Sequence, residues 1–147
     1  MDIYVFSSRD LTNIWAAIGA KKWAVSIKQS NNPSILTKSK NLPIGSFGLF
    51  YCVKEKCLTT PFVIRSKPSQ EETIDNIWDK TWALPFSIIP LGSPNNRLDK
   101  DKLKQLLPYL KNNRRSWDKI FFVGAMMVFT PSKIPEEDWG ILINSLV

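Results

Sequence analysis

Short apolar runs alternate along the chain with segments in which apolar residues recur every three or four positions. The short runs are rich in β-branched and aromatic residues and are bounded by turn residues, which predicts β-strands. The predicted strands cover residues 3–6, 23–27, 47–53, 58–65, 84–91 and 121–129. Apolar residues spaced three or four positions apart predict helices over residues 11–19, 99–110 and 135–146. The polar segments 28–42 and 66–81 are predicted loops. This order of elements predicts an α+β fold in which helices flank a small curved or barrel-like sheet.

The predicted helices carry residues that are typical of helix ends. Asp10 precedes the first helix as a candidate N-cap. Pro108 is expected to bend or end the second helix, because proline lacks a backbone N–H. Pro135 lies in the first turn of the C-terminal helix, and the three acids that follow it complement the helix dipole. The apolar faces of the first and last helices place Trp15 and Trp139 in the predicted core.

The composition is that of a packed domain that contains no histidine. The 147 residues are 44% hydrophobic and show no internal repeat or linker, so we expect a single domain over residues 1–147. The absence of histidine excludes His-based acid–base catalysis, Ser-His and Cys-His nucleophiles, and His-ligated metals. Cys52 and Cys57 are too few for a disulfide framework or a zinc site, and we expect them to face each other across a hairpin as reduced thiols. No metal or cofactor is indicated.

The N-terminus and the hydropathy pattern predict a soluble cytoplasmic protein. The first residues have no basic region and no long apolar stretch, so they do not form a signal peptide. No apolar run approaches the roughly 18 residues of a membrane-spanning helix. The oligomeric state cannot be predicted from this pattern.

Positive charge is concentrated in two stretches of the sequence. The chain has 20 Lys and Arg against 13 Asp and Glu, a formal net charge of +7. Residues 11–54 contain six lysines and no acid, and a second basic cluster runs from Arg97 to Lys119 and includes Arg114 and Arg115. Cations interleaved with aromatic residues are typical of single-strand nucleic-acid binding, because phosphates attract cations and bases stack on flat rings. A solvated lysine-rich surface accounts for the charge equally well.

Three of the six tryptophans lie among polar or charged neighbours. Trp23 follows two lysines at the start of a strand, and Trp78 and Trp82 lie in or beside a polar loop. These three rings form either a surface on which a ligand stacks or a small satellite core. Trp117, beside Arg114 and Arg115, is either a core residue or a cation–π partner.

The order of these motifs resembles that of EVE domains of the small stand-alone archaeal type. A strand is followed by a helix with an early asparagine, Asn13, by a strand that opens with Trp23, and by a Pro-x-Gly turn. A hairpin and a tryptophan-bearing loop come before a Pro-Phe strand, and the tail contains Arg-Arg-Ser-Trp and Pro-Glu-Glu-Asp. EVE domains belong to the PUA-like group and are similar to YTH domains, which hold a methylated base in a cage of three tryptophans. The resemblance covers nearly the whole chain and implies a mixed, barrel-like sheet flanked by helices.

The resemblance implies a non-enzymatic module that binds a modified base of RNA, of single-stranded DNA or flipped out of a DNA duplex. Trp23, Trp78 and Trp82 match the cage positions, and Asn13 matches the residue that contacts the base edge. Two departures are visible: Trp78 and Trp82 are spaced Trp-x3-Trp where YTH domains have Trp-x4-Trp, and the family's Pro-Gly-Asp-like turn is Pro-Ile-Gly-Ser in residues 43–46.

We expect the base to lie between Trp23 and Trp78, with Trp82 as the floor or wall of the pocket. Arg9, Lys21 and Lys22 are candidate contacts for the flanking phosphates. Replacing Trp23 or Trp78 by alanine is expected to weaken binding by about 1–3 kcal/mol and to leave the fold intact.

Two other function classes remain open at this point. A metal-dependent nuclease or base-processing enzyme would need clustered carboxylates, and one loop carries Glu71, Glu72, Asp75 and Asp79. A protein-interaction or accessory subunit of a nucleic-acid modification or defence system would have the same fold with a vestigial pocket.

Overall fold

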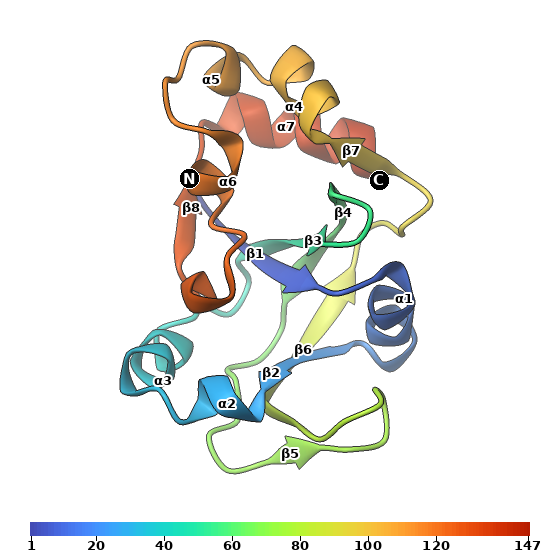
Figure 1. The fold of residues 1–147 in the computed structure, drawn as a ribbon, viewed down its shortest axis with the longest axis vertical. Helices are drawn as coiled ribbons and strands as arrows, with labels where there is room; N and C mark the ends of the chain where they lie inside the picture. The colour runs from blue at the N-terminus through green and yellow to red at the C-terminus, as the bar shows by residue number, and fades with distance from the viewer.

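The structure, a computed structural model that describes all of residues 1–147, is built on a mixed eight-stranded sheet (Figure 1). Six strands lie side by side in the order β2 (Lys22–Ser26), β6 (Trp82–Pro90), β4 (Cys57–Ile64), β3 (Phe47–Cys52), β1 (Asp2–Ser8) and β8 (Pro131–Lys133). The remaining two are β5 (Thr73–Ile74), which pairs with β6, and β7 (Arg97–Asp99), which pairs with β4. β1 and β3 are parallel and the other pairs are antiparallel. The sheet curls into a half-barrel with helices around it, which confirms the predicted α+β class.

Both faces of the sheet are covered, so alternate residues of a strand enter two different cores. On β1, Tyr4 and Phe6 belong to one core, whereas Ile3 and Val5 belong to the other. The first core is covered by α1 (Leu11–Ala20) and α3 (Pro33–Lys40), with the short α2 (Ile27–Ser30), which has no buried residue, between β2 and α3 in the chain. The second is covered by α4 (Lys100–Leu106), α5 (Pro108–Lys111), α6 (Trp117–Phe121) and α7 (Glu136–Leu146). The two helix groups lie toward opposite ends of the molecule in Figure 1.

Short polar side chains begin several of the helices. The Asp10 carboxylate accepts a hydrogen bond from the Asn13 backbone N–H at 3.0 Å and so caps α1 as predicted. Asn32 caps α3, with Pro33 as the first helical residue, and Asp99 caps α4. None of the helices has the length and apolar composition needed to span a lipid bilayer.

The sequence prediction missed the short strands β5, β7 and β8 and differs from the structure in three longer segments. Residues 28–42, predicted as a loop, contain most of α2 and all of α3, because Asn32 and Pro33 start a helix rather than mark a loop. The predicted helix 99–110 is divided at Leu107, which is extended ahead of Pro108. The predicted strand 121–129 is wrong: it holds the end of α6, a left-handed Phe122 and the 3₁₀ helix η1 (Ala125–Met127).

The tryptophans outside the candidate site occupy different environments. Trp15 was expected in the core but is 45% exposed on α1, so that prediction is wrong. Trp139 is buried in the second core, as predicted. Trp117 packs on the same core with its ring centroid 5.2 Å from that of Tyr51, so it is a core residue.

The two cysteines lie opposite each other across the β3–β4 hairpin, as expected, and both are buried free thiols. Burial, and less strongly the neighbouring Cys52, raises the pKa of the Cys57 thiol to about 11. Both side chains are therefore chemically protected in the folded protein.

Two β-bulges bend the sheet, and they share a sequence pattern. β4 has one extra residue between 59 and 62, and β6 has one between 83 and 86. In each bulge a residue with positive φ, Thr60 (51°) or Leu84 (53°), is followed by proline and phenylalanine. Proline cannot donate to the ladder and is accommodated at bulges, where one residue is left unpaired.

Candidate functional site

A cavity of about 220 Å³ lies beside the N-terminus of α1. Its walls come from the end of β1, the first turn of α1, β2, the loop before β6, and the segment around η1. Five of the seven residues selected from the sequence line it: Arg9, Asn13, Trp23, Trp78 and Trp82. Segments that are far apart in the sequence therefore meet at one concave site, a typical arrangement for ligand binding.

Lys21 and Lys22 do not line this cavity. Lys21 ends α1 in the left-handed conformation, and Lys22 begins β2 opposite Ser87 of β6. Both side chains are exposed, so they contribute positive charge to the surface near Trp23 without facing the cavity.

The three tryptophan rings form corners instead of parallel plates. The ring centroids of Trp23 and Trp78 are 5.3 Å apart at an interplanar angle of 81°. Trp78 and Trp82 are 6.2 Å apart at 70°. A base held between two parallel rings needs centroids about 7 Å apart, twice a van der Waals contact. A base therefore does not fit between Trp23 and Trp78 as expected, but it can stack on one ring while the edge of another ring closes the side.

Trp23 and Trp78 also belong to the first core. They are only 6% and 8% exposed, and Trp23 packs on Phe50 with centroids 4.7 Å apart. The bulge at Leu84 shifts the register opposite Trp23, and bulges re-aim side chains in this way beside functional sites. Truncating a buried tryptophan costs about 3–5 kcal/mol, so we now expect Trp23→Ala and Trp78→Ala to lower the stability of the fold as well as to weaken binding.

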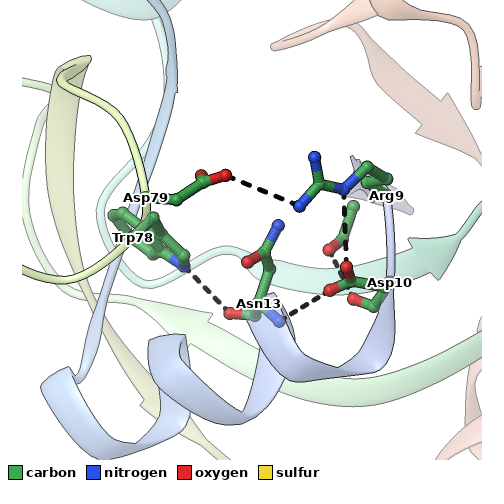
Figure 2. Close-up of polar contacts among 6 residues, drawn as sticks. Arg9, Asp10, Asn13, Trp78 and Asp79 are labelled. Carbon is green, nitrogen blue, oxygen red and sulfur yellow. Dashed lines mark hydrogen bonds and ion pairs between the residues drawn. The ribbon is translucent and has the colours of Figure 1, made fainter.

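Asn13 joins the tryptophan loop to α1 through its backbone (Figure 2). The Trp78 indole N–H donates to the Asn13 carbonyl oxygen at 3.0 Å, and the Asn13 N–H is held by Asp10. The Asn13 side-chain amide makes no hydrogen bond within the protein. Figure 2 shows this amide pointing into the space flanked by Arg9 and Asp79, where it offers two donors and one acceptor atom.

The Trp82 indole N–H is buried without a hydrogen-bond partner. Trp82 is more exposed than Trp23 and Trp78 and lines the cavity at the start of β6. A buried donor without a partner is destabilising by about 1–3 kcal/mol. An acceptor atom on a ligand would remove this penalty.

The rim of the cavity is bridged by an ion pair. The Arg9 guanidinium lies 3.7 Å from the Asp79 carboxylate and 3.4 Å from the Asp10 carboxylate. Arg9 and Asp79 are both more than half exposed, so the pair contributes little to stability. It does partly neutralise Arg9, which lowers the attraction of this side chain for a phosphate.

Sequence reasoning missed the wall opposite the tryptophans. The Gln29 side-chain amide donates to the Ala125 carbonyl oxygen at 2.6 Å, joining α2 to η1. Gly124 and Ala125 line the cavity beside this contact. No local pattern links residues that are 96 positions apart in the sequence, so only the folded structure reveals this wall.

The four acids of the loop before β6 do not come together. Glu71, Glu72 and Asp75 are exposed, and Asp79 lies beside Arg9. No group of three or more His, Cys, Asp or Glu side chains is placed to hold a metal ion.

Solved structures with the same arrangement of elements are YTH domains. The YTH domain of Zygosaccharomyces rouxii MRB1, solved with N6-methyladenosine RNA, is 15% identical with a TM-score of 0.61 over 99% of this chain and 88% of that one. The Toxoplasma CPSF4 YTH domain, solved with a 7-mer m6A-modified RNA, is 15% identical with a TM-score of 0.57 over 97% and 88%. The Mmi1 YTH domain is 11% identical with a TM-score of 0.59 over 98% and 96%.

These likenesses establish a YTH-like fold for the chain. No protein-family model matches the sequence, and no curated protein matches it. At 10–16% identity the solved structures share the fold alone, so the chemistry of the cavity must be argued from its own residues.

Proposed function

We propose that this chain is a non-enzymatic nucleic-acid-binding module that holds a modified, methylated base in the cavity lined by Trp23, Trp78 and Trp82. The convergence of three tryptophans and an unbonded asparagine amide on one cavity carries the proposal. The YTH domains that share the fold and were solved with m6A-modified RNA support it. We infer that residues 1–147 act as a single EVE-like domain, because one continuous sheet includes strands from both ends of the chain.

The size of the cavity suits a base that is extruded from its strand. A buried cavity of about 150 Å³ accommodates one benzene ring, and the cavity here measures about 220 Å³. A flipped base would stack on one indole face and meet a second ring by its edge. The Asn13 amide would then pair with the Watson–Crick edge.

Stacking would provide most of the affinity, and hydrogen bonding would provide the selectivity. Stacking contributes about 1–3 kcal/mol per base, whereas a buried methyl group adds only about 0.8 kcal/mol. Strong preference for a modified base therefore requires that the unmodified base leaves a polar group unpaired. The Asn13 amide, which makes no hydrogen bond within the protein and points toward the cavity, is our candidate for this discrimination.

Phosphates beside the base would be held by cations around the site. Arg9 is the candidate on the rim, and Lys21 and Lys22 are candidates on the surface near Trp23. RNA and single-stranded or flipped DNA present the same phosphates and base faces to such a site.

The proposal is tested by fluorescence titration with modified and unmodified nucleosides and short single strands. The titration uses a Trp15→Phe background, which removes the emission of an exposed ring outside the cavity. We expect quenching that is selective for one modified base. Asn13→Ala should weaken this binding by about 2- to 12-fold, the range expected for one neutral hydrogen bond. Thr12→Ala, an exposed change on the same helix, is the matched control and should have no effect.

Two results would count against this function. Equal weakening by Asn13→Ala and Thr12→Ala would show that the amide does not contact the base. A folded protein that responds to no nucleoside or strand would contradict base binding and would favour the interaction-subunit alternative.

A further inference from the structure

A second hollow, of about 800 Å³, lies next to the base cavity. It is formed by the residues just before α6, α6 itself and the segment up to η1, and its wall includes Arg114, Arg115, Lys119, Phe122, Gly124 and Met127. Gly124 lines both hollows, so the two adjoin at this residue. We call the second hollow the basic groove.

The cations of the basic groove are free of carboxylate partners. Arg114, Arg115 and Lys119 are exposed, and none of them forms an ion pair within 4.0 Å. The groove contains one acid, Asp118, whose pKa is lowered chiefly by a hydrogen bond from the Ser116 hydroxyl. Three cations against one carboxylate leave a net positive groove at neutral pH.

This free charge contrasts with the charge on the rim of the base cavity. Arg9 lies within 4.0 Å of both Asp10 and Asp79. A phosphate that bound Arg9 would have to approach two carboxylates, whereas Arg114 and Arg115 have no such neighbours. The basic groove is therefore the stronger site for a polyanion.

Gly124 is the residue that the base cavity and the basic groove share. Its backbone is extended, with φ −71° and ψ 148°, a conformation that any residue adopts. A Cβ atom at this position would have one neighbour, Met127 Cγ at 4.0 Å. Neither the backbone nor steric crowding requires glycine here, so a larger side chain has room at this boundary between the two hollows.

We propose that the nucleic-acid strand whose base enters the tryptophan cavity leaves across Gly124, with its next phosphates bound by Arg114, Arg115 and Lys119. This inference rests on the proposed function. In addition, the strand should bind in a single 5′-to-3′ orientation, because the basic groove lies on one side of the cavity. Extension of the strand from the modified base should therefore raise affinity mainly in one direction, 5′ or 3′. Ribose and deoxyribose strands present the same phosphates to the groove.

The test compares two triple variants with equal changes in charge. Arg114→Ala/Arg115→Ala/Lys119→Ala removes the groove cations. Lys100→Ala/Lys102→Ala/Lys104→Ala removes three exposed lysines from α4, outside both hollows. Each protein is titrated with the free modified nucleoside and with RNA and DNA strands extended 5′ or 3′ from that base.

We expect the groove variant to bind the nucleoside as the wild type does and to lose affinity for strands extended in one direction. Each lost phosphate contact should reduce the salt slope of log K by about 0.7. If the groove variant loses three contacts, its loss of affinity between 50 and 200 mM salt should be about 20-fold smaller than that of the wild type. The α4 variant should keep most of the wild-type slope. A difference in affinity between the RNA and DNA strands would show which nucleic acid binds along the groove.

A further variant tests the passage without a change in charge. Gly124→Leu places a side chain between the two hollows and should lower the affinity for extended strands more than the affinity for the nucleoside. The proposed strand path would be contradicted if the groove and α4 variants lost equal affinity for extended strands, or if 5′ and 3′ extension raised affinity equally. Either result would leave the proposal of base binding intact. Failure of the nucleoside itself to bind would overturn the proposed function and this path with it.

Discussion

Trp78 has both a ligand-lining role and a structural role, so a mutation at this residue changes binding and stability together. Its ring lines the cavity, and its indole N–H holds the loop before β6 against α1 through the Asn13 carbonyl. At 8% exposure it is also part of the first core. Loss of ligand binding on replacing Trp78 therefore cannot be interpreted until stability has been measured on the same variant.

We predict that Trp78→Phe lowers the free energy of unfolding by about 1–3 kcal/mol, because the Asn13 carbonyl loses its donor. Trp15→Phe is the control, since this exposed ring makes no such bond, and its effect should stay within about 0.5 kcal/mol. Urea denaturation followed by circular dichroism measures both. Equal losses in the two variants would mean that the Trp78 hydrogen bond does not hold the loop.

At the scale of elements, the β3–β4 hairpin turns through a residue with positive φ. Lys56 has φ 52° at the end of the four-residue turn, whereas Lys54 in the same turn does not have positive φ. The left-handed conformation costs about 1–2 kcal/mol in a residue with a Cβ atom, and glycine avoids this cost. The turn therefore contains strain that a single exposed substitution can remove.

We predict that Lys56→Gly raises the free energy of unfolding by about 0.5–1 kcal/mol, the strain removed less the added entropy of the unfolded chain. Lys54→Gly should lower it by a similar amount, since that position gains flexibility without relief of strain. Thermal denaturation of the two variants gives the sign of each change. Two changes of the same sign would contradict this account of the turn.

The elements that were predicted correctly are those with a local signature. β1 and β3 are short runs of β-branched and aromatic residues bounded by turn residues, and the Asp10 cap of α1 is visible in the sequence. The continuous apolar run 121–129 lacks a periodicity that separates strand from helix. In the structure it serves both cores, with Phe121 in one and Phe129 in the other. This division depends on long-range packing that a local pattern does not show.

The candidate site was predicted in part for the same reason. The tryptophans were visible because they stand among polar neighbours, but their perpendicular arrangement depends on the bulge in β6 and on the Asn13 carbonyl. The wall at Gln29 and Ala125 and the basic groove depend on contacts between distant segments.

For the whole molecule, the sheet separates a ligand-facing core from a second, enclosed core. The tryptophan cavity lies at the border of the first core, and the second core is sealed by α4 to α7. Cys52 and Cys57 belong to the first core and form the last pair of the β3–β4 hairpin before its turn. Their accessibility therefore reports on whether this end of the hairpin stays closed.

We predict that thiol alkylation at pH 8 is at least about 1,000-fold slower in the folded protein than in urea, because both thiols are buried and reaction requires unfolding. A modified nucleoside that binds the cavity should slow the reaction further. Iodoacetamide labelling followed by mass spectrometry measures these rates. Fast labelling of the folded protein would show that the hairpin opens locally.

The Cys57 pKa also predicts how stability depends on pH. The folded-state pKa is about 11 against an ordinary value of 9.0, so the unfolded chain releases this proton first as the pH rises. The thiol thus favours the folded state below pH 9, and this contribution is lost as the pH rises from 9 to 11. Urea titrations at pH 8, 10 and 11 should show a steeper loss in the wild type than in Cys57→Ala.

Gly48 lies opposite Phe62 in the β3–β4 pair, and a Cβ atom at Gly48 would come within 2.4 Å of the Phe62 ring. The Pro-Phe steps at residues 61–62 and 85–86 each follow a bulge. The packing of the Phe62 ring and the geometry of the bulges set these requirements, and none of these residues lines the cavity, so they do not change with the ligand. Homologues that have diverged in pocket and surface should therefore retain a glycine and two Pro-Phe dipeptides at these spacings. A genome search for that spaced pattern would recover distant members that overall identity no longer reveals.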